Sequence, residues 1–254
     1  MKKIFILSLF CLLAPSIFGV EIFVHKIGEK KGFMCQAVRL KDNWFLTAAH
    51  CVVPYCDGYN CEAEIPLPNG NVIKAAKQDI SWLNDAKINK TYYDIALIKF
   101  DTSKYSLPAY NPVTVLIIKD FNFDTPKILK RSLEITFSSV GEAGQILSRS
   151  PVLYGPNNKI IFTEEMGLFH GVSGAGVMTN KVSSLGVREL ISVVSGVASN
   201  GGAIKFSVFS VFDEKVKDFL RPVSGLSFSY LTANDFSEVG ERYKEAALSL
   251  DNTK

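Results

Sequence analysis

Three polar residues lie beside apolar stretches of the chain, and their types suit the chemistry of acyl transfer. His50 ends the stretch WFLTAAH, Asp94 opens the stretch DIALIKF, and Ser173 lies within GVSGAG. A serine hydroxyl is a weak nucleophile until a neighbouring base takes its proton and a third group orients that base. Histidine and aspartate suit those two roles, so the three residues predict hydrolysis through a covalent intermediate.

The order of these residues along the chain excludes two other designs of serine hydrolase. An α/β-hydrolase places its histidine after its serine, whereas the three histidines of this chain, His25, His50 and His170, all precede Ser173. The Gly-x-Ser-x-Gly turn of those enzymes also fails, because Ala175 replaces its second glycine. A subtilisin-like order needs an aspartate before the histidine, and the one aspartate there lies in no recognisable motif.

Short apolar runs separated by turn residues make up most of the chain. The runs are rich in Val, Ile and Phe, and Gly, Asn, Pro and Asp lie between them, which is the pattern of short β-strands. The predicted strands include Met34–Leu40, Trp44–Thr47, Ile95–Phe100, Val113–Ile118, Leu133–Phe137, Ile160–Phe162, Leu190–Val197 and Ile204–Val211. Strands this numerous favour a β-sandwich or a β-barrel.

Two segments near the end of the chain show helical spacing instead. Apolar residues recur every three or four positions between Phe212 and Leu220, which predicts a short helix there. A second amphipathic helix is expected within a C-terminal extension over residues 224–254. Its apolar face would consist of Phe236, Val239, Tyr243, Ala246, Ala247 and Leu250.

Residues 1–19 have the pattern of a signal peptide. Lys2 and Lys3 precede the apolar stretch IFILSLFCLLA, and a plausible cleavage site follows near Gly19. The stretch is shorter than the ~20 apolar residues of a spanning helix, and no later stretch reaches that length. We therefore expect a protein that is exported, either periplasmic or secreted, with no membrane span once the signal is removed; an uncleaved anchor is the less favoured alternative.

Four cysteines follow the expected signal peptide: Cys35, Cys51, Cys56 and Cys61. An even number in an exported chain indicates disulfides, and four cysteines allow three pairings that spacing does not decide. Zinc binding by these thiols is disfavoured, because an oxidising compartment favours bridges and the chain has no Cys-x-x-Cys pair. We expect no metal and no cofactor.

The composition narrows the class of protein and of partner. The 254 residues are 47% hydrophobic and carry a formal net charge of +3, so a sizeable core is expected. A basic block with interleaved aromatic residues, typical of nucleic-acid binding, does not occur in the sequence. A protein or peptide substrate and no nucleic acid is the expectation, with the oligomeric state left open.

The motifs around the three polar residues resemble those of the trypsin-like serine peptidases, which have the chymotrypsin fold. LTAAHC matches the histidine motif of that family closely, DIALIKF resembles its aspartate motif, and GVSGAG is a looser match to Gly-Asp-Ser-Gly-Gly. The resemblance implies an all-β fold of two six-stranded antiparallel β-barrels with the active site in the cleft between them. The peptidase domain would span residues 20–223, and its barrels would divide near residues 105–125.

The resemblance also implies a role for each residue. Ser173 would attack the scissile carbonyl, His50 would act first as base and then as acid, and Asp94 would hold the tautomer of His50. The backbone N–H groups of Gly171 and Ser173 would form the oxyanion hole.

The resemblance implies one disulfide as well. Cys35 and Cys51 occupy the positions of the family's bridge around the histidine loop. With that bridge in place, Cys56 and Cys61 are left either to pair with each other or to remain free thiols.

One segment is expected to contact the main chain of the substrate. Ser195, Gly196 and Val197 lie in VVSGVAS, which resembles the strand that binds the peptide main chain in the family. Ordinary strand packing is the alternative.

The expected side-chain pocket lacks an acid. Gly167 stands where family members selective for Arg or Lys carry an aspartate, Leu168 follows it, and His170 lies at the expected pocket mouth or faces solvent without a role. A buried cation without a partner is strongly unfavourable, so small or apolar side chains are expected before the scissile bond.

Two functions from different classes fit these motifs: an exported endopeptidase, or a catalytically silent homologue that binds a partner. The complete trio favours the first, whereas Val172 and Ala175, which replace residues usual in the family, keep the second open. Val172 also cannot accept the salt bridge by which a freshly cut N-terminus activates digestive members. We expect it to be an apolar plug instead, in a protein that needs no zymogen cleavage.

Overall fold

The computed structural model describes residues 19–84, 93–105, 107, 112–119, 127–139, 142–148, 152–154, 161–164, 171–182, 187–199 and 205–240. Residues 1–18 of the expected signal peptide lie outside this set. None of the helices within it has the length and apolar character needed to cross a bilayer.

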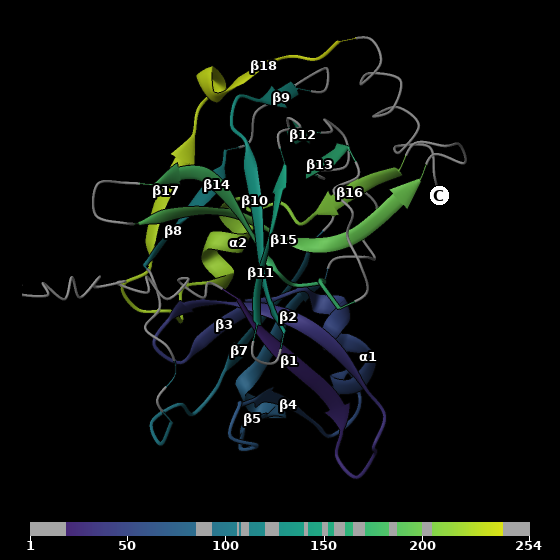
Figure 1. The fold of residues 1–254 in the computed structure, drawn as a ribbon. Coiled ribbons are helices and arrows are strands. Elements are labelled where there is room, and N and C mark those ends of the chain that lie inside the picture. The colour runs from purple at the N-terminus through teal and green to yellow at the C-terminus, as the bar shows by residue number, and fades with distance from the viewer. Residues whose placement is uncertain are drawn as a thin grey trace, which may run out of the picture.

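The first half of the described chain, residues 19–100, forms a curled antiparallel sheet of seven strands in the order β5-β4-β1-β2-β3-β7-β6 (Figure 1). Side chains alternate between the core and the outer face, as they do along β4, where Cys61, Ala63 and Ile65 are buried and the residues between them are half-buried. The strands are β1 (Gly19–Lys26), β2 (Gly32–Lys41), β3 (Trp44–Thr47), β4 (Cys61–Pro66), β5 (Val72–Ala76), β6 (Ile80–Asn84) and β7 (Asp94–Lys99).

The second half begins with β8 and forms an eleven-stranded sheet. Its main path runs β11-β10-β14-β15-β16-β13-β12-β9-β18, and β8 pairs with both β15 and β17 beside that path. The strands are β8 (Val113–Ile118), β9 (Lys127–Leu129), β10 (Leu133–Ser139), β11 (Glu142–Ser148), β12 (Val152–Tyr154), β13 (Ile161–Glu164), β14 (Gly176–Val182), β15 (Arg188–Ser199), β16 (Lys205–Phe209), β17 (Ser227–Leu231) and β18 (Phe236–Glu238).

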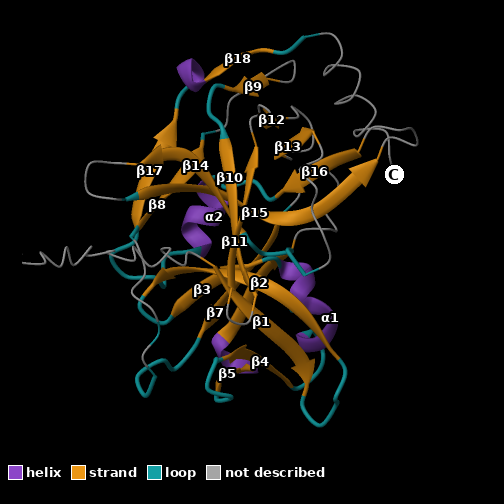
Figure 2. Ribbon diagram, in the orientation of Figure 1, coloured by secondary structure: helices purple, strands orange, loops and turns teal. Residues whose placement is uncertain are grey.

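Helices are few and short in the described chain (Figure 2). The helix predicted between Phe212 and Leu220 is confirmed as α2 (Glu214–Phe219), and Asp213 caps it by accepting hydrogen bonds from two backbone amides of its first turn. The 3₁₀ turn η1 (Ala49–Cys51) and α1 (Val53–Cys56) follow β3 directly. Two further 3₁₀ turns are η2 (Lys77–Asp79) and η3 (Ala233–Asp235).

An apolar cluster joins the two sheets. It contains Val38 and Leu46 from the first sheet and Val115, Met178 and Phe212 from the second half, and all of these side chains are buried. Close packing of this kind resists displacement of one sheet against the other. Residues carried by opposite sheets are therefore held in a fixed relation at this junction.

The all-β fold is confirmed and is consistent with the two-barrel architecture of chymotrypsin, but the strand count and direction differ in detail. The sheets have seven and eleven strands instead of six each, and β8 pairs parallel with β15 and with β17. The C-terminal residues 227–238 cause part of this difference, because β17 and β18 extend the second sheet.

The prediction that Phe236 belongs to a C-terminal helix is wrong, and most of that predicted helix lies outside the described residues. Phe236, the first residue of its predicted apolar face, lies in β18, which pairs antiparallel with β9. Free backbone groups on β9 provide an edge to which an extended segment can add, and this pairing outweighs the local helical spacing. Val239 is buried just beyond β18, and residues 241–254 lie outside the described chain.

Candidate active site

His50 and Asp94 form a directly hydrogen-bonded pair. The His50 Nδ1–H donates to Asp94 Oδ2 over 2.6 Å, and the backbone N–H of His50 donates to Asp94 Oδ1 over 2.7 Å. The carboxylate is thus held at both oxygens, and its side chain is only 6% exposed, against 35% for the imidazole. This arrangement keeps the proton on Nδ1 and leaves Nε2 as the basic nitrogen.

Local structure explains why these two residues meet. β3 pairs with β7, with Thr47 opposite Ala96, so η1 follows β3 at the end of the sheet where β7 begins. Asp94 is the first residue of β7, and its backbone is therefore level with the start of η1. Phe45, Leu46 and the apolar residues of β7 are buried, and the two polar side chains lie at the strand ends.

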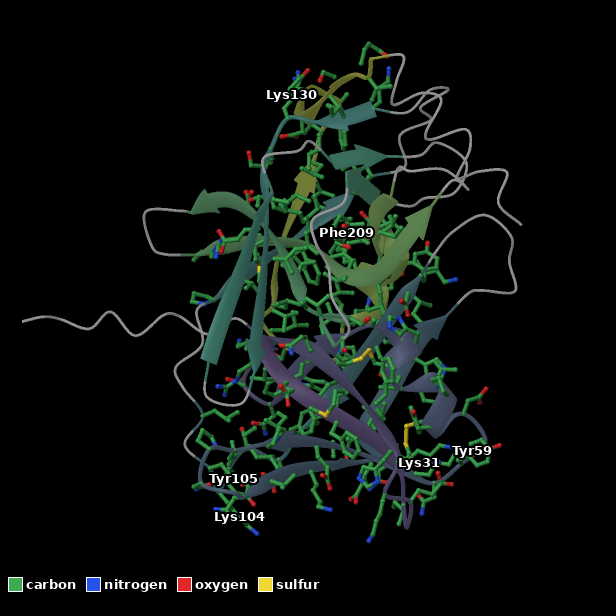
Figure 3. The ribbon with its side chains drawn as sticks, turned by 45° about the vertical axis from the view of Figure 1, so that its right-hand side comes forward. Lys31, Tyr59, Lys104, Tyr105, Lys130 and Phe209 are labelled. Atoms are coloured by element: carbon green, nitrogen blue, oxygen red, sulfur yellow. A yellow bond between two sulfur atoms is a disulfide. The ribbon has the colours of Figure 1, made fainter. Side chains whose placement is uncertain are left out.

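Two disulfides brace this region (Figure 3). Cys35 of β2 is bonded to Cys51, the residue after the histidine, with their Cα atoms 6.3 Å apart. Cys56 at the end of α1 is bonded to Cys61 at the start of β4. The first bridge is the one that the sequence resemblance implied, and of the two alternatives for Cys56 and Cys61 the structure has the bridge.

Serine hydroxyls support Asp94 from the second half of the chain. Ser210 Oγ donates to the backbone carbonyl of Asp94 over 2.9 Å, and it also lies 2.9 Å from Ser195 Oγ. All three residues are buried. Ser210 was missed in the sequence because a serine at the end of an apolar strand carries no motif of its own.

A second hydrogen bond joins the two halves of the chain at the residue before Asp94. The hydroxyl of Tyr93 donates to Asp213 Oδ2 over 2.5 Å, and both side chains are buried. Because Asp213 also caps α2, this hydrogen bond links the residue before Asp94 to the first turn of that helix.

The backbone around Ser173 is anchored against the histidine-bearing sheet. The carbonyl of Ser173 accepts a 2.7 Å hydrogen bond from the amide of Gln36, and Gly174 donates to the carbonyl of Val194 over 2.8 Å. A Cβ built on Gly174 would lie 2.1 Å from Thr47 Oγ1 and 2.2 Å from the carbonyl oxygen of Gln36. The serine segment therefore packs directly on the strands that lead to His50.

His50 and Asp94 are thus paired, and the backbone of Ser173 is bonded to Gln36 on the sheet that carries them. Among the described residues, no hydrogen bond joins Ser173 Oγ to the His50 ring. Such contacts are commonly long in substrate-free sites and shorten when substrate binds.

Two amides beside Ser173 are suited to bind a negatively charged oxygen. Gly171 has φ of +92°, a conformation that glycine adopts without strain and that turns its peptide group. Within the described chain, neither the amide of Gly171 nor that of Ser173 donates to a backbone carbonyl. Val172 between them is 2% exposed and belongs to the apolar cluster of the second sheet, as the apolar-plug hypothesis required.

Part of one edge of β15 has no partner strand among the described residues. Gly196 and Val197 pair with β16 on one side, whereas β14 pairs with β15 only as far as Val193 in the described chain. The side chain of Ser195 points to Ser210, and no described strand pairs with Ser195, Gly196 and Val197 on the edge away from β16. The other expected substrate residues, Gly167, Leu168 and His170, lie outside the described residues.

Comparison with known proteins relates this chain to one family. A family model described as Trypsin matches residues 21–219, from β1 to the end of α2. No curated protein matches the chain. β17 and β18 follow the matched region.

Proposed function

Since this chain belongs to the trypsin family of serine peptidases, we propose that it is an exported endopeptidase that cleaves protein or peptide substrates through Ser173, His50 and Asp94. The observation that carries the proposal is the doubly hydrogen-bonded His50–Asp94 pair, which sets the histidine tautomer needed for general-base catalysis. The peptidase domain would comprise residues 20–223, and residues 224–254 would form an extension to it.

In the first step, Ser173 Oγ attacks the carbonyl carbon of the scissile bond while His50 Nε2 takes the hydroxyl proton. The Nδ1–H of the resulting imidazolium keeps its hydrogen bond to Asp94, whose negative charge stabilises the cation. His50 then gives the proton to the leaving amine, and an acyl group remains on Ser173. A water molecule repeats the sequence in the second step and releases the acid.

The amides of Gly171 and Ser173 would bind the oxyanion of each tetrahedral intermediate. Removal of one such donor typically raises the barrier by about 3 kcal/mol. The substrate main chain would add to the edge of β15 away from β16 at Ser195, Gly196 and Val197, a form of strand addition that orients the scissile bond.

We further propose that the enzyme needs no activating cleavage beyond removal of the signal peptide. Gly19 and Val20 pair with Val38 and Ala37 at the start of β1, so a processed N-terminus there would be part of a sheet. Val172 is already buried among apolar side chains without a salt bridge. A mature chain extended by several residues should keep nearly full activity, and an extended form that gains activity only on trimming would contradict this.

Export is supported by the N-terminal signal pattern and by the two disulfides, which persist in oxidising compartments. Fractionation of cells that express the whole chain tests it. Recovery of processed protein outside the cytoplasm is expected, and unprocessed protein in the cytoplasm would argue against export.

Cleavage of a peptide library by the purified chain and by Ser173→Ala tests the catalytic proposal. The wild type should cut, and Ser173→Ala should lose on the order of 10⁴-fold or more of kcat/KM while folding normally. The second candidate function, a silent binding protein, is favoured by Val172 and Ala175, which depart from the family's serine motif. A folded wild type that cuts nothing would support that function.

A further inference from the structure

His25, Glu62 and Glu64 form a cluster on the outer face of the first sheet. His25 lies on β1 directly opposite Glu62 of β4, and Glu64 follows two positions along the same face. Their neighbours Val24, Ala63 and Ile65 point into the core. The three side chains are only 11–20% exposed, so the cluster is partly withdrawn from water. β1 and β4 lie together in the lower half of Figure 1.

The hydrogen bond at one side of the His25 ring decides what the other side presents. Nδ1 lies 3.0 Å from the backbone carbonyl oxygen of Lys26, which only accepts hydrogen bonds, so Nδ1 carries a proton. Nε2 points to the two carboxylates, 3.5 Å from Glu62 Oε1 and 3.4 Å from Glu64 Oε1. In the neutral ring, a lone pair would face two negative oxygens, and either a proton on Nε2 or a metal ion between the three atoms would remove this repulsion.

The two distances from His25 Nε2 to the carboxylates match the ligand spacing around a small tetrahedral ion. Zinc binds imidazole nitrogen and carboxylate oxygen at about 2.1 Å, which places neighbouring ligands of a tetrahedron about 3.4 Å apart. The two distances from His25 Nε2 have this size, and the three ligand atoms all lie within 4.8 Å of one another. Histidine ligands of metals commonly donate their other N–H to a backbone carbonyl, as His25 does to Lys26.

Lys74 now supplies the positive charge at this cluster. Its Nζ lies 2.9 Å from Glu62 Oε1 and 2.7 Å from Glu64 Oε1, the same two oxygens that face His25. The side chain is 54% exposed and starts from β5, the last strand of the sheet, so it can turn into solvent. A divalent cation would balance the two negative charges of Glu62 and Glu64, and the imidazole is neutral. The ammonium group of Lys74 would then not be needed to neutralise the carboxylates.

We propose that His25, Glu62 and Glu64 form a zinc-binding site that exchanges with the ammonium group of Lys74. Water would complete the coordination. The ion would tie β1 to β4 one residue pair away from Cys61, which is already bonded to Cys56, and would act as a structural clip on the first sheet. The site is independent of the peptidase chemistry proposed above.

Calorimetric titration of zinc chloride into the chelator-treated chain tests this assignment, with Ser173→Ala as the parent to prevent self-cleavage. Zinc should bind the parent, and His25→Gln and Glu62→Gln should each weaken the affinity by about tenfold or more. Lys74→Met should strengthen it by about tenfold or more, because it removes a positive charge from the site. Lys77→Met is the matched control, since its ammonium group bonds a backbone carbonyl instead of these carboxylates, and its affinity should equal that of the parent.

The effect of Lys74→Met separates a metal site from a purely ion-paired cluster. Zinc bound at another histidine, such as His50, would persist unchanged in both His25→Gln and Lys74→Met. Unchanged affinity in these two variants, or no zinc binding by either the parent or Lys74→Met, would overturn the proposal. If His25→Gln does not fold, Glu62→Gln and Lys74→Met still decide the question.

Discussion

The two halves of this chain are stabilised by different means. In the first, Cys35–Cys51 and Cys56–Cys61 fix the segment that carries His50. The second half has no cysteine. An ion-pair network attaches its C-terminal strands instead: the guanidinium of Arg131 pairs with Glu189 and with Asp235, the latter at 2.6 Å.

The difference follows from what each half positions. The histidine segment is a short buried turn, and the Cys35–Cys51 bridge ties the residue after His50 to β2. Ser173 lies in a backbone already confined by Gln36, Val194 and the close approach of Thr47 to Gly174. The first half is therefore expected to be sensitive to reduction, and the C-terminal strands of the second to acid.

The largest expected effect tests whether the two halves work as one site. Asp94→Asn should lower kcat/KM about 10⁴-fold, because the amide no longer holds the reactive tautomer of His50. Peptide hydrolysis measured alongside thermal unfolding separates this from loss of fold. Asp101→Asn, which changes an exposed aspartate bonded to Ser103, is the control and should keep normal turnover. An equal loss in both variants would contradict the assignment of Asp94.

The junction of the halves should be the next most sensitive place. Gly174→Ala adds a Cβ against Thr47 Oγ1 and the Gln36 carbonyl at a φ of +82°, and it should cost about 3 to 5 kcal/mol of unfolding free energy. Urea unfolding measures this, with Gly240→Ala as the control because no atom of the described chain lies within 4 Å of its added Cβ. Near-normal stability of Gly174→Ala would show that the close packing of the serine segment is not as described.

The two disulfides should differ in their contributions. The chain-entropy relation gives about 3 kcal/mol for Cys35–Cys51, which spans 16 residues, and about 2 kcal/mol for Cys56–Cys61, which spans 5. Paired Cys→Ala variants of each bridge, unfolded in urea, measure the two values. Removal of the first should also lower turnover, since it frees the segment that holds His50. Full activity without Cys35–Cys51 would refute its positioning role.

The smallest effect concerns the attachment of the C-terminal strands. Burial opposes ionisation of Asp235, but hydrogen bonds from Thr232 and Arg131 outweigh it and lower its pKa. A carboxyl group with a lowered pKa stabilises the fold at pH values above its ordinary pKa of about 4. This contribution is lost as the pH falls through the lowered pKa. Asp235→Asn should cost about 1 kcal/mol at neutral pH and flatten the acid limb of the stability curve. An unchanged acid limb would show that Asp235 does not hold these strands.

The sequence predicted the candidate catalytic residues His50, Asp94 and Ser173 because motif and chemistry coincide there, and their roles remain the proposal made above. The pairing of His50 with Asp94 depends on two strands meeting in register, which the family resemblance implied and the structure provides. The strands and α2 were also predictable, because one buried face gives a strand or a helix a regular spacing of apolar residues along the sequence. The parallel pairing of β17 with β8 was not, because it joins residues more than a hundred positions apart without a local signal.

Other features escaped prediction for the same physical reason. Phe236 lies in a strand because β9 offers an edge, although its apolar neighbours have helical spacing. Ser210 reaches Asp94 only through the fold of the second half. His25 was noted in the sequence only for its order relative to Ser173, and its contact with Glu62 and Glu64 depends on the register between β1 and β4.

Labelling with a fluorophosphonate probe tests the central claim, that Ser173 of the second half is activated by His50 and Asp94 of the first. The mature wild-type chain should be labelled at one residue, which mass spectrometry of its peptides should identify as Ser173. His50→Ala and Asp94→Asn should label far more slowly, and Ser173→Ala should not label at that peptide. A folded wild-type chain that remains unlabelled, or one labelled equally fast without His50, would contradict the account.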